Sequence, residues 1–233
     1  MQSTGRSVEL RRLYEILDRL MERIGAPIRL GDADVSKIKA KRGVYFFFEP
    51  GEKRSGSGSG LRVVRVGTHA LARGSRSTLR DRLAQHRGTL RKPGGNHRGS
   101  IFRLLIGAAL IEREPTLYRR TWGHGSSAPS EVRAMERTLE ARVSTYIGAM
   151  PFLWLSVDDE PGPESLRGYI ERNSIAVLSD WNKQALDPPS AAWLGRDCPR
   201  ERICGSGLWN SNHVNEFHDR RFLDVLSDLV QAM

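Results

Sequence analysis

GVYFFFEP at residues 43–50 and LRVVRVG at residues 61–67 decide the fold, with GEKRSGSGSG at residues 51–60 between them. Both apolar runs are rich in β-branched and aromatic residues, and the first ends at Pro50, which is typical of strands. The stretch between them has the glycine and serine alternation of a loop. We therefore predict a β-hairpin whose long, flexible tip carries no chemistry.

The sequence around this hairpin has mainly helical spacing. Apolar residues recur every three or four positions over residues 8–24, which predicts an amphipathic helix. Ser77 is the candidate cap of a helix that runs past His86. Further helices are expected near residues 100–111, 129–146, 164–179 and 215–230, and a third strand at residues 151–157. Strands and helices without regular βαβ spacing predict the α+β class, with a small antiparallel sheet flanked by helices.

The chain divides into three expected segments. Residues 1–40 form an N-terminal helical segment, residues 41–160 the core, and residues 161–233 a C-terminal region of helices and loops. No long polar linker separates the last two, so we expect them to pack closely. Apolar runs are too short to span a bilayer, and the N-terminus lacks the apolar core of a signal peptide, so we expect a cytoplasmic protein.

Charge favours a polyanionic partner. Lysine and arginine outnumber aspartate and glutamate by 37 to 27, for a formal charge of +10. Residues 73–103 hold nine of the basic residues and a single acid, Asp81, which indicates a phosphate-facing patch. The candidate nucleic-acid contacts are Arg80, Arg87, Arg91, Lys92, Asn96, His97 and Arg98. DNA is the expected partner, and RNA stays open.

Three short motifs follow one another in the order strand, strand, helix: GVY at 43–45, RVG at 65–67 and RLAQH at 82–86. Together they resemble the signature of the GIY-YIG nuclease superfamily, over roughly residues 40–145. The resemblance implies a divalent-metal-dependent endonuclease, using Mg²⁺ or Mn²⁺, that hydrolyses phosphodiester bonds in DNA.

The resemblance assigns a role to each matching residue. Tyr45 matches the tyrosine that activates a water molecule, although a free tyrosine, with a pKa near 10, needs nearby cations to act as a base. Arg82 matches the helix arginine that holds the scissile phosphate. His86, one turn later, could assist proton transfer or contact phosphate. Taken singly, Tyr45 is more typical of a buried strand and Arg82 of a solvated helix, while His86 is equally typical of a helix end.

The metal ligand is expected in the helix at 129–146, where Glu140 lies in a stretch that resembles the one bearing the family's metal-binding glutamate. One carboxylate can suffice for Mg²⁺ because phosphate oxygens and water complete the octahedron. Glu136, one turn earlier, is the second candidate, and Glu131 is the third.

Two departures from the family pattern matter. Arg65 stands where the second signature tyrosine is expected, and since arginine cannot act as a base, that task falls on Tyr45. No asparagine follows Glu140 closely; Asn173 or Asn182 could replace it. A catalytically inactive nucleic-acid-binding module therefore stays an alternative, as does an unrelated basic protein with chance matches.

The C-terminal region holds two further patterns. Cys198, Cys204, His213 and His218 could bind zinc, although the first spacing is long for such a site, and free thiols are the simpler interpretation. The segment 206–214 clusters aromatic and small polar residues. It could form a packed cap, or its Trp209, Asn210, Asn212 and His213 could line a nucleic-acid cleft.

Overall fold

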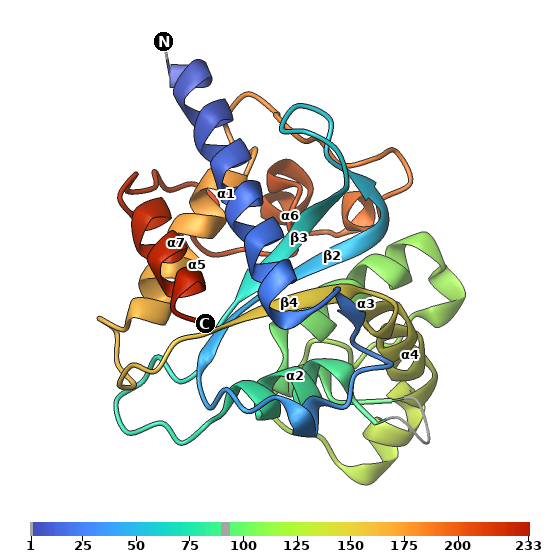
Figure 1. Cartoon of the computed structure of the whole chain (residues 1–233). Helices are drawn as coiled ribbons and strands as arrows, with labels where there is room; N and C mark the ends of the chain where they lie inside the picture. Colours follow the sequence, from blue (N-terminus) through green and yellow to red (C-terminus); the bar gives the residue numbers. More distant parts are fainter. Residues whose placement is uncertain (1, 90–93) are drawn as a thin grey trace.

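The computed structural model describes residues 2–89 and 94–233. Helices α1 (Gln2–Ile24), α2 (Leu79–Arg87), α3 (Ile101–Arg113), α4 (Ser130–Gly148), α5 (Leu166–Leu178), α6 (Glu201–Ser206) and α7 (Phe222–Gln231) surround one sheet (Figure 1). Its strands are β1 (Ile28–Arg29), β2 (Gly43–Lys53), β3 (Leu61–Gly67) and β4 (Pro151–Ser156). The predicted α+β class is confirmed.

The sheet is antiparallel with the order β1-β4-β2-β3, so β2 is paired on both edges. Tyr45 lies opposite Gly67 on β3 and opposite Trp154 on β4. Strand side chains alternate between the two faces. Val44 and Phe46 pack with one set of helices, and Tyr45 and Phe47 with another. Burial on both faces explains why residues 43–48 are continuously apolar.

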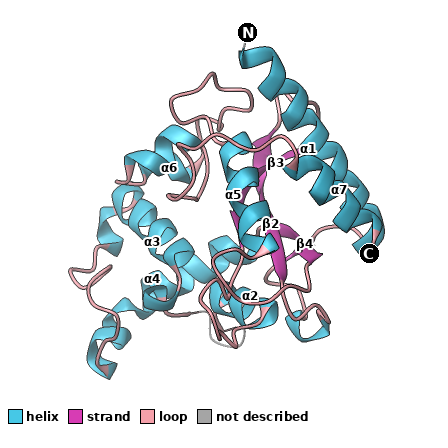
Figure 2. Ribbon diagram, turned by 90° about the vertical axis from the view of Figure 1, so that its left-hand side faces the viewer, coloured by secondary structure: helices cyan, strands magenta, loops and turns pink. Residues whose placement is uncertain are grey.

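The two faces carry different helices. Helices α1, α5 and α7 lie together against one face, while α2, α3 and α4 cover the other (Figures 1 and 2). The C-terminal region supplies Ile170 and Val177 to the same core as Val44 and Phe46. Close packing of this region is therefore observed, while the division into three segments stays a prediction. None of the described helices is long and apolar enough to cross a membrane.

Most predicted elements appear with shifted ends. The cap of α2 is Thr78 rather than Ser77, and its side chain forms a capping box with Asp81. The single acid of the basic segment thus has a structural task. The terminal helix begins at residue 222, later than expected, and the short elements β1 and α6 were not predicted.

Gly43 allows β2 and β4 to approach closely. A Cβ atom at this position would clash with the backbone carbonyl of Leu155 on the neighbouring strand. The first glycine of the GVY motif is therefore a requirement of the sheet, because the gap leaves room only for hydrogen.

The glycine- and serine-rich loop is held in place, which corrects the prediction of a flexible tip. The Asp187 carboxylate accepts hydrogen bonds from the backbone amides of Ser55, Gly56 and Ser57 at 2.8 to 3.0 Å, and another from the Ser57 hydroxyl. The glycine and serine content of the loop indicated a flexible backbone. However, a carboxylate 130 residues away in sequence accepts the hydrogen bonds of these amides.

Replacing Asp187 with alanine should release this loop. Loss of an ionised acceptor with several donors should lower the free energy of unfolding by about 2 kcal/mol. Urea unfolding measures this change, and hydrogen exchange should accelerate at residues 55–57. Asp158→Ala, at an exposed aspartate, is the matched control. Unchanged protection of the three amides in the Asp187 variant would contradict this assignment.

Candidate active site

A pocket of about 410 Å³ opens where β3 ends. Its wall combines β3 and the turn after it, α2, α5 and the segment 210–213, so residues far apart in sequence meet there. Arg65, Arg82, His69 and Glu171 are its ionisable side chains of most chemical interest. The structure thus brings together Arg65 and Arg82 of the predicted site, with a carboxylate that the sequence analysis did not select.

Two arginines give the pocket its positive charge. Arg65 is buried on β3, donates a hydrogen bond to the Trp209 carbonyl and lies over the Phe102 ring, 4.7 Å from its centroid. Arg82 on α2 donates to Gln85 Oε1 at 2.6 Å. Within residues 2–89 and 94–233, the Nε atoms of both arginines are buried without a hydrogen-bond partner. Unsatisfied charged donors of this kind suit an anionic ligand.

Tyr45 and His86 form a buried pair beside Arg65. The Tyr45 hydroxyl lies 2.7 Å from His86 Nε2, and His86 Nδ1 lies 2.8 Å from Ser100 Oγ. Burial lowers the pKa of His86 well below its ordinary value, and the charges of Arg82 and Arg65 lower it further. His86 is therefore a neutral imidazole at neutral pH.

Gly67 explains how the tyrosine side chain fits. A Cβ atom at Gly67 would collide with the Tyr45 hydroxyl and ring. The tyrosine ring therefore lies across the backbone of β3, directly opposite in the sheet register. Burial lowers the pKa of the Arg65 guanidinium. The adjacent Tyr45 hydroxyl and the Glu171 carboxylate oppose this effect because they favour the charged guanidinium.

Glu171 on α5 is the carboxylate of this pocket. Its Oε1 accepts a hydrogen bond from the Thr68 amide at 3.2 Å. Burial raises the pKa of the Glu171 carboxyl, while Arg65, His213 and Arg82 oppose that rise. It forms no ion pair with any residue that the structure describes, in contrast to Glu140 and Glu136.

The sequence analysis missed Glu171, although one indication was present. Residues 173–178, which follow it closely, are buried, and Ile170 precedes it. An acid at the edge of such an apolar stripe is unusual, because carboxylates are seldom placed against a core without a task.

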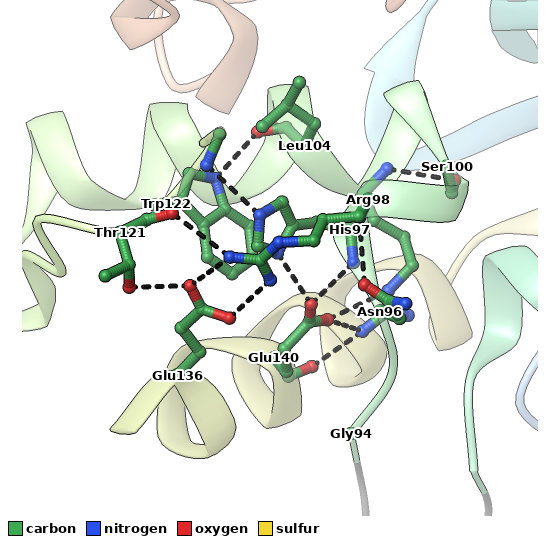
Figure 3. Close-up of polar contacts among 12 residues, drawn as sticks. Gly94, Asn96, His97, Arg98, Ser100, Leu104, Thr121, Trp122, Glu136 and Glu140 are labelled. Atoms are coloured by element: carbon green, nitrogen blue, oxygen red, sulfur yellow. Dashed lines mark hydrogen bonds and ion pairs between the residues drawn. The ribbon is translucent and has the colours of Figure 1, made fainter. Parts of the chain in front are cut away.

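Glu140 lies elsewhere, in an internal ion-pair network (Figure 3). Its carboxylate accepts hydrogen bonds from Arg103 at 2.5 and 3.0 Å and from the amide and Nδ1 of His97 at 2.6 and 3.0 Å. These bonds and the Arg103 charge outweigh burial and hold its pKa below the ordinary value. Glu140 does not line the pocket of Arg65 and Arg82 but a second pocket of about 800 Å³, and Gln85 lines both. The assignment of the metal to Glu140 stays a prediction.

The same network accounts for three other predicted residues. Arg98 forms a bidentate ion pair with Glu136 at 2.7 and 2.8 Å, and both side chains are almost fully buried. His97 stacks on Trp122 with ring centroids 3.8 Å apart. Since the Gly123 amide donates to His97 Nε2, the proton is on Nδ1, facing Glu140. His97 and Arg98 therefore face inward, contrary to their expected place on a phosphate-facing patch.

The remaining predicted nucleic-acid contacts have different surroundings. Arg80 is exposed, Arg87 donates to the Ala33 carbonyl at 2.6 Å, and Asn96 caps the turn at Arg98. Arg91 and Lys92 lie outside the described residues. Glu131, the third metal candidate, is exposed at the start of α4.

Several C-terminal candidates do reach the pocket. Asn210, Asn212 and His213 line it, whereas Trp209 is buried in the core. Asn210 bonds both backbone groups of Val66, at 2.8 and 3.0 Å, as a neighbouring strand would. Asn173 instead bonds the backbone of α5 and residue 219, and Asn182 lies at a second pocket.

The cysteines and histidines considered for zinc have other partners. His213 and His218 each contact a glutamate at 2.8 Å, Glu216 and Glu9 respectively. Both cysteines contact backbone carbonyls. Within residues 2–89 and 94–233, no three metal-ligating side chains gather in a metal-binding arrangement.

The fold and the pocket define an α+β protein in which two arginines face one carboxylate at the end of a β-hairpin. Residues 4–233 match a family model described as "GIY-YIG domain", and the chain belongs to this family. The match confirms the resemblance and extends it over nearly the whole chain. Membership indicates a nuclease-type function with a nucleic-acid substrate. No curated protein and no solved structure shows significant similarity to the chain.

Replacing Glu140 with alanine should destabilise the protein. The change leaves Arg103, which is fully buried, without its carboxylate, and such losses cost about 3 to 5 kcal/mol. Urea unfolding at neutral pH measures the difference. Because the folded-state pKa is held below 4.5, the contribution should be present above that pH and should shrink as pH falls through the lowered value.

Glu131→Ala on the same helix is the control for this change and should have little effect, because Glu131 is exposed. A Glu140 variant as stable as wild type would contradict the structural role.

Proposed function

We propose that the protein is a divalent-metal-dependent endonuclease that hydrolyses phosphodiester bonds in DNA at the pocket after β3. One observation carries the proposal: Arg65 and Arg82 present unpartnered donors beside the Glu171 carboxylate, next to the buried Tyr45–His86 pair. Cationic donors, a carboxylate and a proton acceptor are the groups that phosphodiester hydrolysis requires.

Arg82 and Arg65 bind the scissile phosphate. Both Nε–H groups lack a partner among the residues that the structure describes, so a phosphate oxygen gains hydrogen bonds without displacing any of these. Their charges also offset the negative charge that develops on phosphorus substituents during in-line displacement. Exposed Arg80 and the net charge of +10 attract the DNA backbone.

Tyr45 acts as the general base, with His86 as its proton acceptor. The neutral imidazole can accept the hydroxyl proton at Nε2 when Nδ1–H is donated to Ser100 Oγ. The adjacent Arg65 guanidinium stabilises the resulting phenolate. Tyr45 is fully buried, so this role requires Arg65 to turn toward the bound phosphate and admit water to the hydroxyl.

Glu171 takes the metal role that the sequence analysis gave to Glu140. A partly buried carboxylate with no ion-pair partner among the described residues fits Mg²⁺ or Mn²⁺, since phosphate and water supply the remaining oxygens. When bound, the metal would polarise the phosphate and stabilise the leaving oxygen. Glu140 cannot serve without breaking its bonds to Arg103 and His97.

The decisive assay is nicking of supercoiled plasmid with and without Mg²⁺. Wild type should cleave only with metal. Tyr45→Phe removes the acid–base group and should slow cleavage roughly 100-fold or more. Glu171→Gln keeps the shape but loses the charge, and should slow cleavage by a similar factor.

The matched controls are Tyr118→Phe, at an exposed tyrosine, and Glu164→Gln, at an exposed glutamate just before α5. Both should cleave as wild type does. Undiminished cleavage by either site variant would refute its assigned role. If wild type binds DNA but leaves plasmid and short duplexes intact, the inactive binding module, which Arg65 and the buried Tyr45 keep open, is favoured instead.

A further inference from the structure

Among the described residues, four of the seven buried side-chain atoms without a hydrogen-bond partner lie in one pocket, and the other three are Arg54 Nε, Arg87 Nε and Ser174 Oγ. The four atoms in the pocket are Arg65 Nε, Arg82 Nε and both ring nitrogens of His69. All three residues line the same pocket. The proposed function uses the two arginines and leaves His69 without a task, although a histidine with two unpartnered nitrogens is costly to bury.

A buried arginine, Arg167, holds the backbone of His69 in place. The His69 carbonyl accepts a hydrogen bond from Arg167 Nη1 at 2.9 Å, and Arg167 is itself fully buried and paired with Asp159. Ala70, the next residue, has a φ of 56°, a conformation that non-glycine residues seldom adopt. The turn is therefore held in an unusual backbone conformation. The His69 side chain lines the pocket and is only 6% exposed.

The surroundings of His69 favour the neutral ring. Burial and the charges of Arg167, Arg82 and Arg42 together lower its pKa to about 4, while the Lys41 carbonyl acts in the opposite direction. Asp81 is the nearby acid. The Lys41 carbonyl is close, but neither ring nitrogen has a hydrogen bond of normal geometry. The His69 ring is thus neutral, with one donor and one acceptor nitrogen. The surrounding arginines make the potential at the ring positive, which favours an anionic ligand there.

We propose that His69 is a further substrate-binding residue, whose ring N–H donates a hydrogen bond to a phosphate oxygen of the nucleic acid in this pocket. The inference rests on the proposed function only for the identity of the ligand. It requires no proton transfer, and it assigns the same ligand to His69 that the unpartnered Nε atoms of Arg65 and Arg82 call for.

His69→Phe is a sharp test because it removes both nitrogens and keeps a planar ring. No hydrogen bond of normal geometry to a described residue is lost, so the variant should be about as stable as wild type. Its affinity for thymidine 3′,5′-bisphosphate, measured by calorimetry, should fall roughly 10-fold or more, the expected effect of a hydrogen bond to a charged group. His69→Gln, which keeps a donor, should recover part of the loss.

His124→Phe, at an exposed histidine, is the control and should bind as wild type does. A second readout uses the folded wild-type protein: the imidazole ¹⁵N signals of His69 should shift when the bisphosphate is added. Equal affinity of wild type and His69→Phe, absence of this shift, or no binding to wild type would each overturn the contact.

Plasmid nicking by the same variants separates this inference from the proposed function. If wild type fails to nick DNA but binds the bisphosphate in a His69-dependent manner, the nuclease proposal fails and the phosphate contact stands. If wild type nicks DNA and His69→Phe matches it in both affinity and rate, the nuclease proposal stands and the contact is refuted.

Discussion

The ion pair between Arg103 and Glu140 is the constraint on which the site geometry depends. Arg103 is fully buried on α3 and also bonds the His86 carbonyl at the end of α2. One guanidinium therefore joins α2, α3 and α4. Ser100, which caps α3, contacts His86 Nδ1 as well. A buried ion pair gives little net stability over apolar packing, but it fixes one arrangement of its partners. Here that arrangement orients the imidazole toward Tyr45.

The two faces of the sheet contribute different residues to the candidate site. Tyr45 points toward α2 and α3, so the Tyr45–His86 pair is buried in that half of the protein. Glu171 comes from α5, which packs with the opposite core, and reaches the pocket where β3 ends. The site thus needs both halves, since neither face alone holds the arginines and the carboxylate.

The sequence allowed the hairpin, the order of the motifs and the fold class to be predicted, because these depend on local spacing and apolar content. Arg82 and Arg65 followed from the resemblance of their motifs to the family signature. Glu140 and Glu171 could not be separated in this way. Both are glutamates on helices among apolar residues, and only the tertiary structure reveals that Arg103 neutralises one. The prediction of a flexible loop at residues 51–60 was wrong for a similar reason, because the residue that holds the loop, Asp187, is distant in sequence.

The pocket and the network differ in how they satisfy their charges. In the network, each carboxylate has its cation, and His97 has a partner at both nitrogens. In the pocket, Arg65, Arg82 and His69 keep unpartnered nitrogens. Burial of unpartnered polar groups costs free energy. Because the Glu140 network is satisfied and the pocket nitrogens are not, the pocket is the better candidate for a ligand-binding site. The proposed phosphate ligand would supply acceptors for these donors and offset their positive charge.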